Sequence, residues 1–219
     1  NALMAGEFQV EKPENPFFYA LDINKHIAQK DLPYNKQDVV YLAFDFNISP
    51  MTCVVAQFKP GVYLHILKAY KIRNITIKEF CYQIRKDYPG AVFRVTADPA
   101  GGARSVGYDS VSTTMHSIIR QSLNLGMNQM DKPMLNFNRR DAWTEVRVFC
   151  NAVLQSHPNI GISPKAAIEL INDLELATTI ENEDKLYKTS GDTEFGMHLT
   201  DCFIYLLTTY FNTYLKRQL

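Results

Sequence analysis

The sequence lacks an excess of charge of either sign. Its 219 residues include 23 lysines and arginines and 23 aspartates and glutamates, so the formal net charge at pH 7 is zero. Proteins that hold nucleic acid on a broad basic face usually carry a surplus of lysine and arginine. The balance therefore gives no overall signal for nucleic acid. It fits a domain whose substrate is delivered by another domain.

Paired cysteines and long apolar runs are also missing. No Cys-x-x-Cys pair occurs, and each cysteine lies in an apolar context, which is more typical of a reduced core residue than of a zinc ligand or a disulfide partner. No uninterrupted apolar run approaches the roughly 20 residues of a membrane span, and no signal peptide is visible. These absences indicate an intracellular domain. The four widely separated cysteines are Cys53, Cys81, Cys150 and Cys202.

The start of the chain has little hydrophobic periodicity. We interpret residues 1–2 as the remnant of a cleaved expression tag, which suggests a fragment of a longer protein. Prolines punctuate residues 3–38, but aromatic side chains such as Phe17 and Phe18 are unusual in a disordered tail. We therefore expect a lead-in or linker over 1–38, part of which packs on a folded domain over 39–219.

Strand and helix patterns alternate through the expected domain. Three β-branched and aromatic runs separated by turn residues predict consecutive antiparallel strands at 39–47, 51–59 and 62–72. The class is then α/β, with a mixed central sheet of three antiparallel strands followed by parallel strands, flanked by helices. Further strands are expected at 91–97, 134–137, 160–162 and 185–188. Helices are expected at 77–87, 112–124, 139–154, from Ser163 to about 177, and 197–216.

Local capping chemistry supports two of these helices. Thr76 and Glu79 have the spacing of a capping box at the start of the first helix. Ser163 followed by Pro164 has the pattern of an N-cap with proline at the first helical position.

An aspartate interrupts the apolar run at 39–46. An unpaired buried carboxylate pays a large desolvation cost, so Asp45 either has a cation nearby or caps the turn that follows the strand. Asp98 ends a second strand-like run, and Asp201 stands in the first turns of the apolar final helix. Carboxylates and water are the ligands that Mg²⁺ and Mn²⁺ prefer. Acids at the end of the first strand, at the end of a later strand and on the final helix are the layout that resembles a ribonuclease-H-like metal site, so we expect the three to meet around a divalent metal.

At these residues the chain resembles the nuclease domain of the large terminase subunit of tailed bacteriophages, which belongs to the ribonuclease-H-like superfamily. The order and spacing of the motifs span nearly the whole chain, and Pro33-Tyr34 resembles the end of the linker that joins the family's ATPase to its nuclease. The matching motifs are Asp-Phe-Asn-x-x-Pro at 45–50, Ala-Asp-Pro-Ala-Gly at 97–101, Asn-Arg-Arg at 138–140, Ile-Ser-Pro at 162–164 and His-x-x-Asp-x-x-x-Tyr at 198–205.

The resemblance implies a metal-dependent endonuclease that cuts concatemeric viral DNA during genome packaging, by hydrolysis with two Mg²⁺ or Mn²⁺ ions. Asp45, Asp98 and Asp201 become the metal-binding acids, with Asp45 bridging the ions, and His198 orients Asp201 or the DNA. The implied partners are double-stranded DNA, the ATPase domain of the same full-length chain, the small terminase subunit and the portal. The implied location is the cytoplasm of a bacterial host, for a phage or prophage protein. No G-x-x-x-x-G-K-[ST] motif occurs, so we expect DNA cleavage without ATP hydrolysis.

Several polar residues near these motifs are candidates for contact with DNA or with the metal ligands. For Asn47 we favour the alternative interpretation, an ordinary turn residue. The arginines at 139 and 140 also suit a solvated helix face. The fourth acid or lysine that some members of the family place before the last helix has its nearest candidates between 185 and 194. The candidates are Asn47, Arg104, Arg139, Arg140 and Lys188, with Lys185, Asp192 and Glu194 in the same late loop.

Two other functions stay open at this stage. A resolvase- or transposase-like nuclease of the same fold would usually carry stronger basic patches. A non-catalytic module that docks a packaging motor onto a capsid portal is compatible with the neutral charge and the aromatic lead-in.

Overall fold

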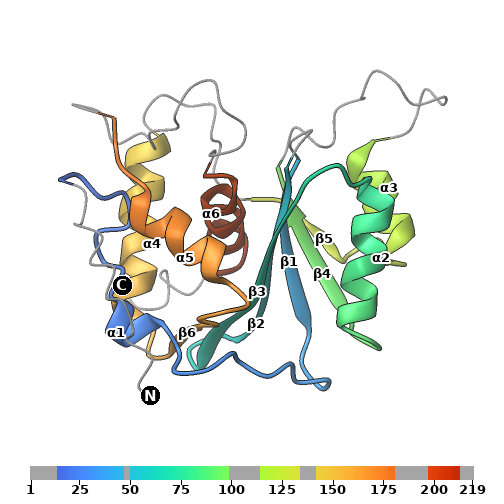
Figure 1. The fold of residues 1–219 in the computed structure, drawn as a ribbon, viewed down its shortest axis with the longest axis horizontal. Coiled ribbons are helices and arrows are strands. Elements are labelled where there is room, and N and C mark those ends of the chain that lie inside the picture. Colours follow the sequence, from blue (N-terminus) through green and yellow to red (C-terminus); the bar gives the residue numbers. More distant parts are fainter. Residues whose placement is uncertain (1–13, 47–49, 99–113, 134–141, 181–196, 213–219) are drawn as a thin grey trace, which may run out of the picture.

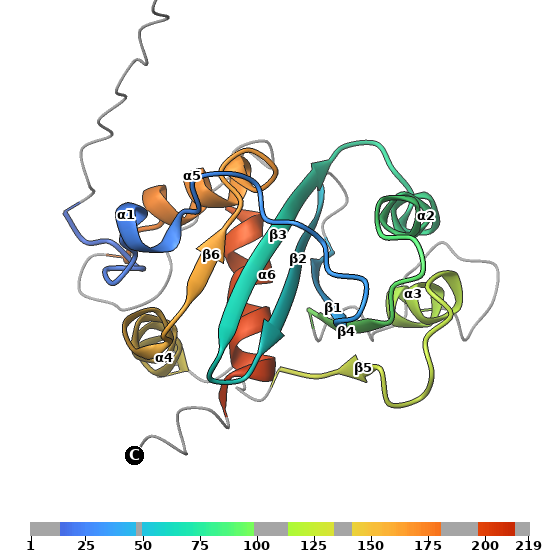
Figure 2. The ribbon, with the colours of Figure 1, turned by 90° about the horizontal axis from the view of Figure 1, so that it is seen from below.

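The computed structural model describes residues 14–46, 50–98, 114–133, 142–180 and 197–212. Within these ranges, one mixed sheet lies between two layers of helices, with α4, α5 and α6 on one side and α2 and α3 on the other (Figures 1 and 2). The strands are β1 Val40–Asp45, β2 Met51–Lys59, β3 Tyr63–Ile72, β4 Phe93–Ala97, β5 Met130–Asp131 and β6 Ile160–Ile162. The helices are α1 Ile23–His26, α2 Ile77–Asp87, α3 Met115–Ser122, α4 Ala142–Ser156, α5 Ile168–Leu176 and α6 His198–Tyr210.

The sheet combines an antiparallel meander with parallel additions on both sides. Its six strands follow the order β5-β4-β1-β2-β3-β6. Strands β1, β2 and β3 pair antiparallel, whereas β4 pairs parallel with β1 and β5, and β6 pairs parallel with β3. The sequence-based expectation of three antiparallel strands followed by parallel ones is confirmed, and β1 lies inside the sheet.

One end of the sheet brings polar residues into a row. In β1 and β2, Asp45 lies opposite Thr52, and Thr52 lies opposite Lys71 in β3. The parallel register of β1 with β4 ends at Phe44 and Ala97, and the Asp98 amide donates to the Phe44 carbonyl at 3.1 Å. Residues directly opposite one another share a face of the sheet. We call Asp98, Asp45, Thr52 and Lys71 the edge row.

The edge row lies on the face of the sheet that α6 covers. Thr96 lies two residues before Asp98, and its hydroxyl oxygen is 2.8 Å from that of Thr209 at the far end of α6. Since side chains alternate along a strand, Asp98 points to the same side. The core on this face is built from β1, β2 and β3 together with α4, α5 and α6, and a second core fills the space between the sheet and α2 and α3.

The lead-in packs into the core on the α6 face. Phe17 is fully buried, its amide donates to the Ala177 carbonyl at 2.7 Å, and Phe18 is 3% exposed with its ring against Phe203 of α6. Tyr19, by contrast, is 46% exposed. The expectation that part of the aromatic lead-in packs on the domain is therefore confirmed.

We expect the Phe17→Ala substitution to lower the free energy of unfolding by about 3–5 kcal/mol, because it removes a fully buried aromatic ring and leaves a cavity. Urea denaturation measures the change. Tyr82→Ala, which truncates an aromatic side chain that is 72% exposed, should stay within about 0.5 kcal/mol of the parent. Equal small effects at both positions would mean that the lead-in is not part of the cooperative unit.

Most expected elements are present near their predicted bounds. Helix α2 begins with the predicted capping box, in which the Glu79 amide donates to the Thr76 hydroxyl and the Thr76 amide donates to the Glu79 carboxylate. All four cysteines are buried and free, as expected of reduced core residues. The expected strands at 134–137 and 185–188 lie outside the described residues, and β5 was not expected. Among the described helices, none has the length and apolar character needed to cross a membrane.

The predicted start of α5 is wrong. Ser163 is not its N-cap, because residues 164–167 form turns and the helix begins at Ile168. The Ser163 hydroxyl oxygen instead accepts a hydrogen bond from the Leu32 amide at 3.0 Å. Asp31 accepts hydrogen bonds from the amides of residues 165 and 166 at 2.8 and 3.0 Å. The lead-in thus supplies hydrogen-bond partners to residues 163–166, which the sequence pattern had predicted to be the start of the helix.

Candidate metal centre

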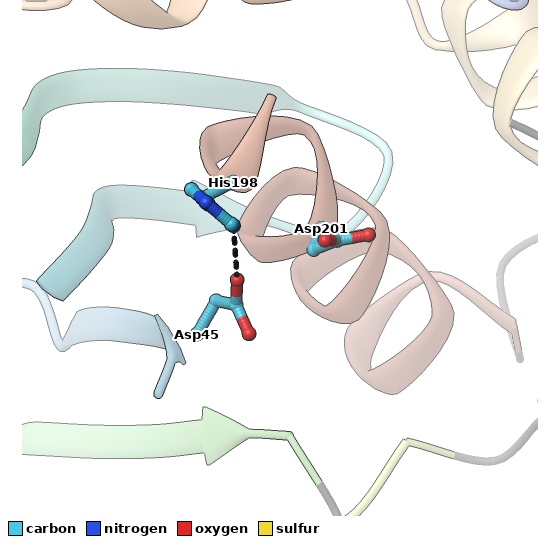
Figure 3. A group of neighbouring side chains, drawn as sticks. All are labelled: Asp45, His198 and Asp201. Atoms are coloured by element: carbon cyan, nitrogen blue, oxygen red, sulfur yellow. Dashed lines mark hydrogen bonds and ion pairs between the residues drawn. The ribbon is translucent and has the colours of Figure 1, made fainter. Parts of the chain in front are cut away.

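The first turn of α6 and the end of β1 bring three potential metal ligands together. Asp45 is the last residue of β1, and His198 and Asp201 stand three residues apart at the start of α6, on the same helix face. One ligand atom from each residue lies within 4.8 Å of the other two (Figure 3). Asp45 and Asp201 are 7% and 5% exposed. Two predicted metal-binding acids therefore converge with the predicted histidine.

His198 contacts Asp45 directly. Its Nδ1 atom lies 3.2 Å from Asp45 Oδ2, with side chains that are 13% and 9% exposed, respectively (Figure 3). Water screens interactions between buried groups much less than interactions at the surface. The sequence analysis had placed His198 beside Asp201 or the DNA. In the structure the contact of its Nδ1 atom is with Asp45, the acid of β1.

Asp98 faces the same region from β4, although it is not one of the three residues grouped within 4.8 Å. Burial raises the pKa of Tyr205 in α6, and the negative charges of Asp201, Asp98 and Asp45 raise it further. The charges of all three carboxylates therefore act on the pKa of the same tyrosine. The Asp98 carbonyl oxygen also lies 3.0 Å from His116 Nε2 in α3, which ties the end of β4 to the opposite helical layer.

The donor set suits a hard divalent cation. Carboxylate oxygens are the ligands that Mg²⁺ and Mn²⁺ prefer, whereas imidazole and soft thiolate ligands are more typical of other metals. Cys202 is adjacent to Asp201, but burial and the nearby Asp45 carboxylate raise its pKa well above the usual range, so the thiol stays protonated. Its sulfur lies 3.4 Å from the Thr52 hydroxyl oxygen of the edge row. A divalent ion would offset the clustering of negative charge at this edge.

A further acid and a lysine adjoin the centre, and the sequence did not single them out. Asp173 of α5 is 8% exposed, its Oδ1 lies 3.7 Å from Lys71 Nζ, and its Oδ2 accepts from the Leu199 amide at 3.2 Å. Burial raises the pKa of Asp173, while the charges of Lys71 and His198 act in the opposite direction. An acid on the apolar face of a helix was the available signal, and it is the same argument that singled out Asp201.

The remaining candidates cannot be placed. Asn47, Arg104, Arg139, Arg140 and Lys188 lie outside the described residues. Lys185, Asp192 and Glu194, the alternatives in the late loop, lie outside them as well.

The strand order and the covering helices are those of a ribonuclease-H-like α/β fold. No protein-family model matches the chain, and no curated protein matches it. Among solved structures, it is similar to large terminase nuclease domains from several bacteriophages.

The structural matches cover most of each chain at low sequence identity. The nuclease domain of the large terminase from bacteriophage SPP1, with bound Mn, aligns with a TM-score of 0.53 and 15% identity over 94% of this chain and 99% of that chain. The P22 large terminase nuclease domain aligns with a TM-score of 0.56 and 11% identity over 87% and 92%. The nuclease from thermophilic phage G20c, with bound magnesium, gives 0.50 and 12% over 87% and 97%. The resemblance found in the sequence is confirmed at the level of the fold.

Proposed function

We propose that this chain is a metal-dependent DNA endonuclease in which Asp45, Asp98 and Asp201 hold Mg²⁺ or Mn²⁺. The observation that carries the proposal is the convergence of Asp45, His198 and Asp201 within 4.8 Å, at the carboxyl edge of β1. The fold that places them there is shared with nuclease domains whose structures contain bound Mn or magnesium.

The roles of the residues follow from their positions. Bound divalent ions would lower the pKa of a water molecule and stabilise the leaving oxygen of a phosphodiester. Asp45 lies between Asp98, just after the end of β4, and the first turn of α6, so it would be the acid best placed to serve both ions. Asp98 and Asp201 complete the two sides, and His198 orients Asp45 through its Nδ1 atom.

The biological reaction that this activity supports is the cutting of concatemeric viral DNA during genome packaging. The zero net charge suits a domain that receives double-stranded DNA from an ATPase domain of the same full-length chain. The small terminase subunit and the portal are the other partners of such a motor, in the cytoplasm of a bacterial host. The proposal rests on the likeness to terminase nuclease domains together with the site.

A supercoiled-plasmid assay tests the proposed activity. The parent protein is expected to nick and linearise plasmid in Mn²⁺ or Mg²⁺ and to be inactive in EDTA, because carboxylates alone supply no cation to activate water. Restoring Mn²⁺ in excess over EDTA should restore cleavage, which separates metal removal from denaturation. Cleavage at the same rate in EDTA would contradict the proposal. A strong preference for junction DNA would indicate a resolvase-like nuclease instead.

A further inference from the structure

An ion pair adjoins the candidate metal centre without being part of its ligand set. Lys71 ends the edge row on β3, and Asp173 reaches it from α5 at 3.7 Å. Their side chains are only 18% and 11% exposed, respectively. Removing two charges from water is costly. The attraction between them offsets this cost only where the geometry is good and further hydrogen bonds satisfy both groups. The pair therefore calls for a role beyond surface charge balance.

That role is at the beginning of α6, where a backbone amide needs a hydrogen-bond acceptor. Its N-cap residue is Met197, which makes no side-chain capping hydrogen bond. The first amides of a helix have no partner within the helix and need an acceptor from elsewhere. Asp173 supplies one, because its Oδ2 accepts from the Leu199 amide at 3.2 Å. A carboxylate at this end of a helix also interacts favourably with the helix dipole.

The amide that Asp173 holds lies between the two α6 residues of the candidate metal centre. Leu199 directly follows His198 and precedes Asp201 by two residues. Any shift of this turn therefore moves the imidazole and the Asp201 carboxylate relative to Asp45, which belongs to the rigid sheet. Removing a group that hydrogen-bonds a metal ligand typically changes metal affinity or activity by 10–100-fold, and Asp173 would act on two such ligands through the backbone between them.

We propose that Asp173, fixed by Lys71, is a positioning residue that sets the first turn of α6 against β1 and so fixes the spacing of the metal ligands. The inference rests on the proposed function, because it assigns the pair to the same metal site. Lys71 holds Asp173 from the sheet, and Asp173 holds the Leu199 amide. The sheet thereby controls the start of α6 through a chain of two contacts.

Calorimetric titration with Mn²⁺ measures the predicted effect without relying on cleavage. Asp173→Ala should weaken Mn²⁺ binding about 10–100-fold, because the Leu199 amide loses its acceptor. Asp173→Asn keeps an oxygen for that amide but loses the charge that pairs with Lys71, so its shift should be smaller than that of Asp173→Ala. Lys71→Met should also weaken binding, and the double variant Asp173→Ala/Lys71→Met should be no weaker than Asp173→Ala alone, since both changes interrupt one chain of contacts.

A matched control separates positioning from general stability. Asn151 of α4 is fully buried and accepts a hydrogen bond from the Ala20 amide at 2.8 Å, so Asn151→Ala also removes a buried tertiary acceptor, but one that serves the lead-in. Asn151→Ala should lower the thermal midpoint and leave the Mn²⁺ affinity at the parent value. In plasmid cleavage, Asp173→Ala should be partly rescued by higher Mn²⁺, whereas Asn151→Ala should need none.

The outcomes distinguish this inference from the proposed function. Parent-like Mn²⁺ affinity in both Asp173→Ala and Asp173→Asn, while the parent itself binds Mn²⁺ and cuts DNA, would overturn the positioning role and leave the nuclease intact. Failure of the parent to bind Mn²⁺ and to cleave would refute the nuclease proposal itself. If Asp173→Ala does not fold, Asp173→Asn and Lys71→Met carry the comparison, and parent affinity in both overturns the inference.

Discussion

The Asp45→Asn protein is expected to lose plasmid cleavage by at least about 10³-fold, which corresponds to about 4 kcal/mol of transition-state stabilisation. The amide has nearly the shape of the carboxylate but carries no charge. Asp45 lies 3.2 Å from His198 and groups with Asp201, so it is the acid on which the proposed ions depend most. Initial rates of supercoiled-plasmid nicking at saturating Mn²⁺ measure the loss.

The same substitution should not unfold the protein. Without metal, replacing one carboxylate of a cluster relieves repulsion between like charges, so the thermal midpoint should stay at or above that of the parent. Glu14→Gln, which neutralises an exposed acid of the lead-in, is the matched control and should retain parent activity. Parent-rate nicking by Asp45→Asn would contradict the assignment and would leave this acid as a turn cap at the end of β1.

Asp98→Asn is expected to reduce cleavage by a similar factor of about 10³, but through a different step of metal loading. Asp98 stands one register step beyond the β1–β4 pairs and outside the group of three ligands within 4.8 Å. The ion held by Asp45 and Asp201 should therefore bind with nearly parent affinity in this variant. Binding of the ion that needs Asp98 should be weakened. Mn²⁺ calorimetry should then show fewer bound ions per protein molecule.

Two results would contradict this account of Asp98. Parent-rate cleavage by Asp98→Asn would mean that the acid serves the turn at Asp98-Pro99, as its sequence context also permits. Loss of all Mn²⁺ binding in the variant would instead mean that the three residues within 4.8 Å do not form a separate site.

Local chemistry made much of the fold predictable from the sequence. The strands β1, β2 and β3 follow β-branched and aromatic runs bounded by turn residues, and α2 follows a capping box at Thr76. The acids Asp45 and Asp201 stood out because a carboxylate in an apolar segment needs a partner. Both are buried and face one another across β1 and α6.

Contacts between distant segments explain what could not be predicted. The first residue of α5 depends on Asp31 and on the Leu32 amide, which lie more than 130 positions away from their partners in the turn at 163–166. Strand β5 has only two residues and exists through its pairing with β4, so no periodicity announces it. Asp173 and Lys71 likewise lie on separate elements, and only the folded chain brings them to 3.7 Å.

The position of Asp98 beside Asp45 also depends on tertiary structure. Parallel pairing of β1 with β4 skips two intervening strands and a helix, and the sequence shows only that each run ends in an acid. The expectation that the two acids meet came from the resemblance to the terminase nuclease family. The pairing register supplies the physical reason, because it places Asp98 next to Asp45 at one edge of the sheet.

Anomalous diffraction from crystals soaked in Mn²⁺ is the measurement that tests the central claim most directly. The account predicts a peak coordinated by Asp45 and Asp201 at the start of α6, and a second peak between Asp45 and Asp98. The first peak should vanish in crystals of Asp45→Asn. A fully soaked crystal with no Mn²⁺ at these acids, or with Mn²⁺ bound only elsewhere on the molecule, would contradict the account.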